Sequence, residues 1–523
     1  MKKSLTALLV LLSLFVLSAC SDPGSDAAVD ADSTADDGAS VEMTDGDGEP
    51  EMAAGADLPI NTDSAEALEA YVQGEYFMDV GRGVQARAKF QEAISDDTNF
   101  VRAYWGLSNV ALSFNEFQGA VDAAKAHLGD ASASDKALID VNASFLTNDP
   151  SQGEAVAEKL AAEYPESPRA WMVLAGMQTG QNKNEAARES YNKALAVDSN
   201  SAGALMGLAT NYLFNEPKDF DQAEQTIDSF NQAYPDEARG YETLGDIKRA
   251  QGDLESSLAA YQNAAMVDHT LELALHKQGH INSFLGNIDE ARASYDAAIE
   301  VAPAESKAGY AVYKCFTRIH EGDINAAIDE LVALADGVSE MGTPDDQVKG
   351  LQVFALTSAS QAALHAGMYD RAAELIQRRN EINDAIAADV GTEDAARLVH
   401  ANNLMWDGLL AAYQGNGEAA DQAASEIAAI VAEDDNPRKM ESVHWVRGLA
   451  ALKAGDFDTA AMELDEADHA NDMYIRYQLA EAYAGAGETE DAQLLYQQVA
   501  DFNFNSVGFA LVGTDAEQKA AGG

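Results

Sequence analysis

Residues 241–264 read YETLGDIKRAQGDLESSLAAYQNA, and residues 275–298 read LHKQGHINSFLGNIDEARASYDAA. The second stretch begins 34 residues after the first, and small or aromatic residues recur at matching positions. The matching pairs are Gly245 and Gly279, Gly252 and Gly286, Ser257 and Ala291, Tyr261 and Tyr295, and Ala264 and Ala298. A fixed offset of this size indicates a structural repeat, in which every unit builds the same piece of local structure.

The same local context recurs along most of the chain: a Gly-containing turn, a few polar residues, then a small residue and a helical pattern. The small residue stands at Ala86, Ala120, Ala155, Ala187, Ala223, Ser257, Ala291, Ala327, Ala372, Ala420, Ala460 and Ala492. The successive spacings are 34, 35, 32, 36, 34, 34, 36, 45, 48, 40 and 32 residues. Abundant Ala and Glu, and only 11 Pro residues, predict helices rather than strands in both halves of each period.

Close packing of a helix hairpin explains the small residues. Gly245, Gly279, Ala187 and Ala291 lie where a larger side chain would push the two helices apart. Aromatic residues beside them fill the wider gaps. Because no single hairpin can bury its apolar face alone, neighbouring hairpins must stack into one continuous core. The sequence therefore predicts an all-α fold.

The residues of each unit resemble the tetratricopeptide repeat family. That family carries aromatic, Leu, Gly and Tyr positions on the first helix, then Ala, aromatic, Ala and Pro positions on the second. Two units that follow this scheme contain Trp171, Leu174, Ala187, Tyr191 and Ala194, and Leu479, Tyr483, Gly487, Ala492 and Tyr496. The resemblance covers residues 61–505 and implies a right-handed α-solenoid of about 12 helix hairpins after a disordered tether.

The N-terminus carries an export signal. Lys2 and Lys3 precede a short apolar run, which is too short for a comfortable membrane span. The run ends in Leu17-Ser18-Ala19-Cys20, which resembles the lipobox of bacterial lipoproteins. The resemblance implies lipidation of Cys20 and a mature chain that begins there, anchored by acyl chains in a membrane. Ser21 follows, where Asp favours inner-membrane retention in enteric bacteria, so we expect the outer membrane, facing the periplasm.

Composition and spacing divide the chain into six predicted segments. Residues 1–19 form the signal peptide, and residues 20–60 form the lipidated Cys with an acidic tether that is expected to be disordered because its hydrophobicity is low. An N-terminal array at 61–335 is followed by a break or loop at 336–347, where the repeat spacing stretches. A C-terminal array at 348–505 and a capping segment and tail at 506–523 complete the chain.

Charge and cysteine content restrict the partners. The formal net charge of −55 opposes binding to nucleic acid, which requires a basic surface. The two cysteines, Cys20 and Cys315, cannot form a disulfide framework, and Cys315 lies in an apolar helical run that predicts an inert, partly buried thiol. The fold requires no cofactor. No phosphate loop, nucleophile elbow or dinucleotide fingerprint is found, so no enzyme activity is predicted.

The first helices of tetratricopeptide repeats line a concave groove, and the resemblance places two groups of residues there. The last repeats offer an apolar stripe of Met405, Leu409, Trp445, Leu449, Leu452, Tyr474 and Tyr477. The stripe is either an exposed partner-binding surface or packing between neighbouring helices. The middle repeats offer a mixed polar surface of Arg239, Glu242, Asp246, Arg249, His276 and His280. Protein or peptide segments are the predicted partners of this groove.

Two more specific sites are not supported. Some family members hold a peptide carboxylate with Lys and Asn, but Trp105 stands where the first Lys is expected, beside Asn109. His276 and His280 lie four residues apart on one helical face, a geometry that can hold zinc. No third ligand follows and Lys277 replaces the Glu of a metalloprotease, so packed or solvated histidines are preferred.

The leading hypothesis is a membrane-anchored scaffold or adaptor that binds other proteins at the bacterial cell envelope. A more specific alternative is a component of a machine that exports polysaccharide or assembles outer-membrane proteins. A third hypothesis, from another class, is a glycan-binding or catalytic solenoid whose site is built from groove carboxylates. The oligomeric state is left open, since an uncapped end of the array could pair with a second copy.

Overall fold

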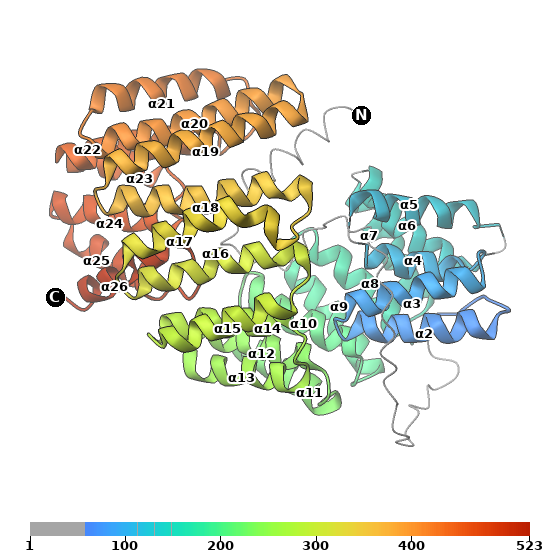
Figure 1. Cartoon of the computed structure of the whole chain (residues 1–523). Helices are drawn as coiled ribbons and strands as arrows, with labels where there is room; N and C mark the ends of the chain where they lie inside the picture. The colour runs from blue at the N-terminus through green and yellow to red at the C-terminus, as the bar shows by residue number, and fades with distance from the viewer. Residues whose placement is uncertain (1–57, 112, 130, 148, 523) are drawn as a thin grey trace. The chain divides into compact units, whose positions relative to one another are not determined.

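The structure is a computed structural model that describes residues 58–522 except 112, 130 and 148 (Figure 1). The described residues contain helices and no strands, and they fall into two compact units that divide between Asp268 and His269. We call residues 58–268 the N-terminal unit and residues 269–522 the C-terminal unit. The predicted signal peptide, the lipidation site at Cys20 and the tether up to residue 57 lie outside the described residues.

The N-terminal unit contains twelve α-helices. They are α2 (Ala65–Asp79), α3 (Gly83–Asp96), α4 (Val101–Asn109), α5 (Phe114–Ala126), α6 (Ala133–Thr147), α7 (Pro150–Glu163), α8 (Pro168–Thr179), α9 (Asn184–Val197), α10 (Ala202–Phe214), α11 (Phe220–Ala233), α12 (Ala238–Ala250) and α13 (Leu254–Val267).

The C-terminal unit contains thirteen α-helices and one short 3-10 helix, η1 (Val338–Met341). The α-helices are α14 (Glu272–Phe284), α15 (Ile288–Val301), α16 (Ala304–His320), α17 (Ile324–Gly337), α18 (Asp345–His365), α19 (Tyr369–Val390), α20 (Glu393–Tyr413), α21 (Gly417–Val431), α22 (Glu441–Ala454), α23 (Phe457–Asp465), α24 (Met473–Ala486), α25 (Thr489–Ala500) and α26 (Val507–Ala520).

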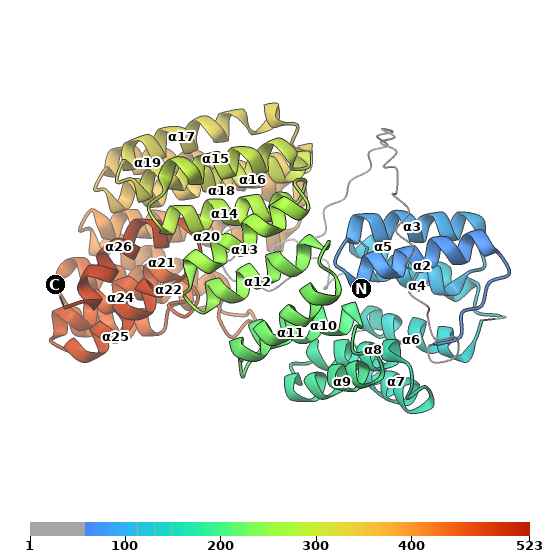
Figure 2. The same ribbon diagram turned by 90° about the horizontal axis from the view of Figure 1, so that it is seen from below.

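Successive helices pair into hairpins, from α2–α3 to α24–α25, so each unit holds six hairpins and the C-terminal unit ends with α26. In each unit the first helices of successive hairpins contact one another, as α8 contacts α10 and α14 contacts α16. The second helices pack mainly against the first helices before and after them, which makes an inner and an outer layer (Figure 2). The predicted α-solenoid of about 12 hairpins is confirmed.

Small residues lie against aromatic rings inside the hairpins, as the sequence predicts. A Cβ atom added to Gly279 would lie 2.7 Å from Cε1 of Tyr295, and one added to Gly245 would overlap the ring of Tyr261. Both rings are fully buried and cannot move aside. Glycine at these two positions therefore sets the distance between the two helices of the hairpin.

The turns after several first helices also depend on glycine, and the turn after α12 is one of them. Gly252 has φ +81°, a left-handed conformation that glycine adopts without a steric penalty. One residue later the side chain of Asp253 accepts a hydrogen bond from the backbone N–H of Ser256 and caps α13. Together these two residues end one helix and start the next within a short loop.

Two predicted segments differ from the structure. The segment 336–347, predicted as a break between arrays, lies inside the C-terminal unit, where Val338 is fully buried and η1 contacts α16, α17 and α18. Leu58 and Ile60, predicted as the end of the tether, pack against apolar residues of the N-terminal unit. The predicted capping segment and tail contains the helix α26, which extends to Ala520.

Within residues 58–522, apart from the three gaps, no helix is both long and apolar enough to cross a membrane.

We predict that Gly245→Ala lowers the free energy of unfolding of the N-terminal unit by about 1–3 kcal/mol, because the added methyl overpacks against Tyr261. Gly119, inside α5, has no neighbouring atom within 4 Å of an added Cβ and serves as the control. Gly119→Ala should leave stability unchanged or raise it by up to about 1 kcal/mol through helix propensity. Urea denaturation followed by circular dichroism measures both, and equal stabilities of the two variants would contradict the prediction.

Candidate functional site

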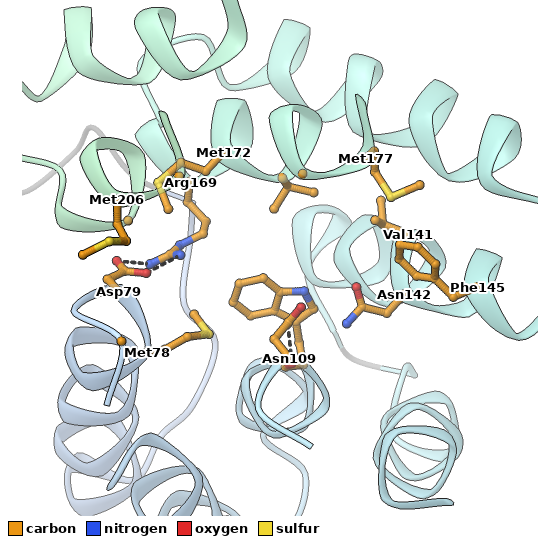
Figure 3. Close-up of a pocket in the computed structure, with 16 residues that line it drawn as sticks. Met78, Asp79, Asn109, Val141, Asn142, Phe145, Arg169, Met172, Met177 and Met206 are labelled. Carbon is orange, nitrogen blue, oxygen red and sulfur yellow. Dashed lines mark hydrogen bonds and ion pairs between the residues drawn. The ribbon is translucent and has the colours of Figure 1, made fainter. Parts of the chain in front are cut away.

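A pocket of about 430 Å³ opens on the inner layer of the N-terminal unit (Figure 3). Its walls come from the first helices of five successive hairpins, α2, α4, α6, α8 and α10, and from the turn after α2. The lining residues are Met78, Asp79, Gly81, Trp105, Asn109, Val141, Asn142, Phe145, Arg169, Met172, Val173, Gly176, Met177, Gly203, Met206 and Gly207. The repeat thus assembles one surface from segments spread over more than a hundred residues of sequence.

The pocket is mainly apolar and rich in methionine. Phe145 is 51% exposed, and Met78, Met172 and Met206 are only half-buried, so apolar surface faces the opening. Methionine side chains are flexible and polarisable, which lets a surface adapt to ligands of different shape. At Gly176 an added Cβ would meet no atom within 4 Å, so the absence of a side chain there keeps part of the pocket empty.

An ion pair closes one side of the pocket. Arg169 on α8 donates two hydrogen bonds to the carboxylate of Asp79 on α2, at 2.8 and 2.7 Å. Its Nε also lies 3.1 Å from a carboxylate oxygen of Glu75. Gly203 on α10 permits this approach, because a Cβ atom there would lie 3.0 Å from Oδ1 of Asp79. These contacts hold α2 against α8 and α10, although the helices are far apart in sequence.

A second set of contacts fastens α2 to the sixth hairpin. The hydroxyl of Tyr76 donates to Glu237 at 2.6 Å, and Nε of Arg82 lies 2.7 Å from the other oxygen of the same carboxylate. Glu237 is the residue before α12 and is almost fully buried. We call the contacts of Asp79 and Glu75 with Arg169, and those of Tyr76 and Arg82 with Glu237, the α2 clasp.

The charges in and near the pocket are paired. Asp79 and Arg169 are the charged residues among its lining residues, and they bind each other. Burial tends to lower the pKa of Arg169, but Asp79 and Glu75 outweigh this effect, so its pKa is raised and it remains charged. Burial raises the pKa of Glu75, more than Arg169 lowers it. The pocket therefore offers no unpaired ion to a ligand and no pair of free carboxylates for acid–base chemistry.

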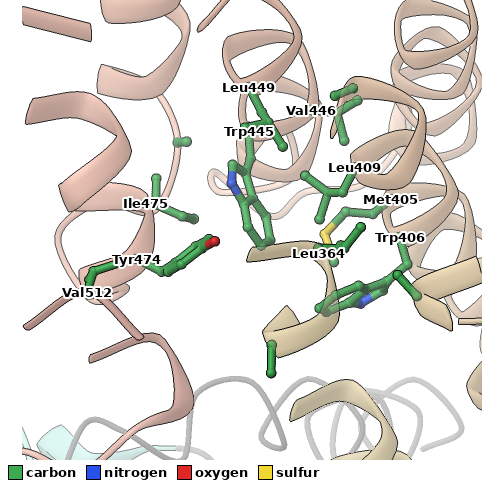
Figure 4. Packing of buried hydrophobic residues seen from close by; sticks show 14 of the residues in the cluster. Leu364, Met405, Trp406, Leu409, Trp445, Val446, Leu449, Tyr474, Ile475 and Val512 are labelled. Carbon is green, nitrogen blue, oxygen red and sulfur yellow. The ribbon is translucent and has the colours of Figure 1, made fainter. Parts of the chain in front are cut away.

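The apolar stripe predicted in the last repeats is packing and not exposed surface (Figure 4). Met405, Leu409, Trp445, Leu449 and Tyr474 each have 7% or less of their surface exposed. Trp445 donates its indole N–H to Gln478 at 2.9 Å and meets the ring of Trp406 edge-on. These side chains belong to the large apolar core cluster of the C-terminal unit, which the repeat register alone does not reveal.

The two remaining residues of the stripe are half-buried. Leu452 and Tyr477 pack against the edge of the same apolar cluster. The hydroxyl of Tyr477 binds Asp515 and accepts a hydrogen bond from Lys519 at 2.7 Å, both on α26. The inner face of this unit is therefore covered by its own last helix at this position.

The polar residues predicted in the middle repeats also serve the interior. Glu242, Asp246 and Arg249 are buried, and Asp246 accepts a hydrogen bond from Tyr261 at 2.7 Å. Asp246 also pairs with Arg249 at 3.3 Å, and Glu242 pairs at the same distance with Arg239, which is partly exposed. None of these residues lines the methionine-rich pocket.

The two candidate histidines are packed rather than solvated. His276 and His280 are buried, with ring centroids 4.2 Å apart, and both lie within 6 Å of the ring of Tyr295. His276 also stacks on Tyr310 at 4.3 Å. No group of three or more His, Cys, Asp or Glu residues with metal-binding geometry occurs in the described part of the chain.

Two residues considered for a carboxylate clamp do reach the pocket. Trp105 and Asn109 both line it, but the amide of Asn109 donates to the backbone carbonyl of Trp105 at 2.7 Å.

Cys315 is buried, and burial raises the pKa of its thiol to about 12, which makes it unreactive as the sequence predicts. The methionines of α8 and α10 are the groove residues that the sequence analysis missed. The sequence feature that could have identified them is a methionine at the same position of two successive repeats, Met172 and Met206, which are 34 residues apart.

The fold and the groove define a helical-repeat scaffold, a class that presents a concave surface to partners. The comparisons with known families agree with this class. A tetratricopeptide repeat model matches residues 71–136 and 147–204, and a second tetratricopeptide repeat model matches residues 273–305. The matched segments contain helices of both units, and among the helices that line the pocket they include all of α4 and α8.

Solved structures of repeat proteins resemble parts of the chain. YrrB, described as a TPR protein with an unusual peptide-binding site, is 21% identical and covers 37% of this chain and 94% of its own, with a TM-score of 0.28. The pilF protein of Pseudomonas aeruginosa is 19% identical over 39% of this chain and 91% of its own, with a TM-score of 0.33. A tetratricopeptide repeat protein from Parabacteroides merdae is 12% identical over 56% of this chain and 100% of its own, with a TM-score of 0.31. No curated protein matches the chain in sequence.

We predict that Trp445→Ala destabilises the C-terminal unit by about 3–5 kcal/mol, because it empties a packed site in the core. Met462→Ala is the control, since Met462 is 61% exposed and should change stability by no more than about 0.5 kcal/mol. Thermal unfolding followed by circular dichroism measures the difference. A native-like melting temperature for Trp445→Ala would show that the indole lies on a surface and not in the core.

Proposed function

We propose that the chain is a membrane-anchored scaffold of the bacterial cell envelope that binds segments of other proteins in the groove of its N-terminal unit. The observation that carries the proposal is the methionine-lined pocket on the inner layer, with Phe145 and several methionines facing its opening. Exposed apolar surface of this kind is costly in water and is typical of interaction sites.

The chemistry of the pocket favours an apolar segment of a partner protein. Its charged lining residues, Asp79 and Arg169, neutralise each other, so an ionic ligand gains nothing from them. Phe145 offers aromatic surface, and the half-buried Met78, Met172 and Met206 offer adaptable apolar surface, which suits Leu, Met or aromatic anchors. A glycan or a nucleic acid would require more hydrogen-bonding groups or basic charge than this lining offers.

The sequence that resembles a lipobox supports the membrane anchor. Lipidation of Cys20 would hold the chain at a membrane, and the acidic segment after it would space the repeats from the lipid surface. Ser21 supports placement at the outer membrane, facing the periplasm. Association with an export or assembly machine would be one specific form of this scaffold function. We propose no catalytic activity, because the groove lacks a free acid–base pair.

We predict that Gly176→Leu abolishes partner binding while the fold is kept, because the new side chain fills the pocket from α8, where an added Cβ meets no other atom. Gly119→Leu, on the exposed side of α5, makes the same chemical change away from the pocket. Crosslinking in intact cells and quantitative mass spectrometry of captured proteins should show a loss of about tenfold or more for Gly176→Leu alone.

Circular dichroism and melting temperature establish that both variants are folded. Partners recovered equally with native chain, Gly176→Leu and Gly119→Leu would place binding outside the pocket and reject the proposed groove.

A separate prediction tests the anchor. Cys20→Ser should move the chain from the membrane fraction to the soluble fraction, because the acyl chains no longer attach. Cys315→Ser is the matched control, since it removes the other cysteine, which is buried, and should leave the distribution unchanged. Cell fractionation with immunoblotting gives the readout, and a Cys20→Ser chain that stays with the membrane as fully as the native chain would refute lipid anchoring at Cys20.

A further inference from the structure

The inner face of the C-terminal unit is occupied by the unit's own C-terminal segment. Residues 501–506 lead from α25 into α26, and α26 packs against α16 and α18 in addition to α24 and α25. An ordinary capping helix contacts only the last hairpin of a repeat array. Here the segment also reaches the first hairpins of the unit.

A buried asparagine makes the most specific of these contacts. Asn505 is fully buried, and its side-chain nitrogen donates to the hydroxyl of Tyr295 on α15 at 2.9 Å. Its side-chain oxygen lies 3.2 Å from Nε2 of His320 on α16, which donates to it. Both sides of the amide are thereby satisfied by residues some two hundred positions earlier in the chain. Buried amide contacts of this kind discriminate strongly, because an unpaired partner would be left in the interior.

Aromatic side chains flank this asparagine on both sides. The ring of Phe504 lies 6.2 Å from the ring of His280, and Phe509 meets Phe284 edge-on at 5.4 Å. Phe502 lies 5.8 Å from Phe509 and completes the cluster. Aromatic residues that fill a concave surface around one hydrogen-bonded amide form the arrangement of an anchored peptide ligand.

We propose that the inner face of α14 and α16, which the hydroxyl of Tyr295 reaches from α15, is a second binding groove. It is specific for a short non-helical segment leading into a helix, in which an amide side chain is flanked by aromatic residues. Residues 502–509 of the chain itself occupy it. The N-terminal unit thus has an open groove and the C-terminal unit a groove that is filled in cis. A foreign segment of the same chemistry enters only by displacing the C-terminal segment. This proposal does not rest on the function proposed for the N-terminal pocket.

The test uses the full chain and a fluorescent peptide of residues 501–513, DFNFNSVGFALVG. Asn505→Asp places a carboxylate in a fully buried site and should release the segment in cis. Gln518→Glu makes the same amide-to-acid change on an exposed residue of α26 and is the control. We expect Asn505→Asp to bind the peptide at least about tenfold more tightly than the native chain and Gln518→Glu, measured by fluorescence anisotropy.

Specificity is tested with the same peptide carrying Asp in place of its asparagine at position 505, which should not bind any of the three chains. Equal binding of the native peptide by native chain, Asn505→Asp and Gln518→Glu would overturn the proposal. So would the absence of binding to a folded Asn505→Asp chain.

A second experiment avoids any substitution in the groove and tests the proposal even if the Asn505→Asp chain does not fold. A specific protease site is inserted between Asp501 and Phe502 of the full chain, and the folded chain is then cut. We expect the fragment from Phe502 onward to remain bound in gel filtration and to be replaced by excess labelled peptide. Loss of the fragment from a chain whose circular dichroism is unchanged, with no uptake of labelled peptide, would overturn the proposal.

Discussion

The close approach of two helices inside a hairpin, where an aromatic ring of one helix lies over a glycine of the other, is the contact on which the rest of the structure depends. Tyr261 over Gly245 and Tyr295 over Gly279 are two instances of it. Where such a contact fixes the distance between the two helices of a hairpin, the next hairpin stacks on it in the same way. Within each unit the first helices then form an inner layer, and side chains distant in sequence converge on one surface.

The two units use that inner layer differently. In the N-terminal unit, small residues and methionines on α8 and α10 leave a pocket, and Arg169 draws α2 toward it. In the C-terminal unit, α26 and the segment before it return to the inner face, where Asn505 is enclosed. One repeat architecture therefore gives one surface open to partners and one that is already covered, without any change in the hairpin itself.

The hairpins were predictable from the sequence because their determinants are local: Gly245 and Tyr261 are separated by one short turn, and the pattern returns after 34 residues. The groove was not, since Trp445 in a packed core and Met172 at a pocket occupy comparable first helices. Whether such a side chain remains accessible depends on the curvature of the inner layer, which is the sum of small rotations between successive hairpins. Contacts between residues far apart in the sequence, such as that of Asp79 with Arg169, determine this curvature, and they leave no local sequence pattern.

The α2 clasp changes how the N-terminal unit can come apart. In a linear stack of repeats the terminal hairpin has a neighbour on one side only. It therefore frays first, and the stack unfolds one hairpin after another from its end. Here Glu237, next to the sixth hairpin, holds Tyr76 and Arg82 from the first one. Because the α2 clasp joins the first hairpin to the sixth, the contacts within the unit form a closed ring and not an open chain. Fraying of α2 therefore requires the loss of contacts at both ends of the array together, which couples the stability of the first hairpin to that of the last.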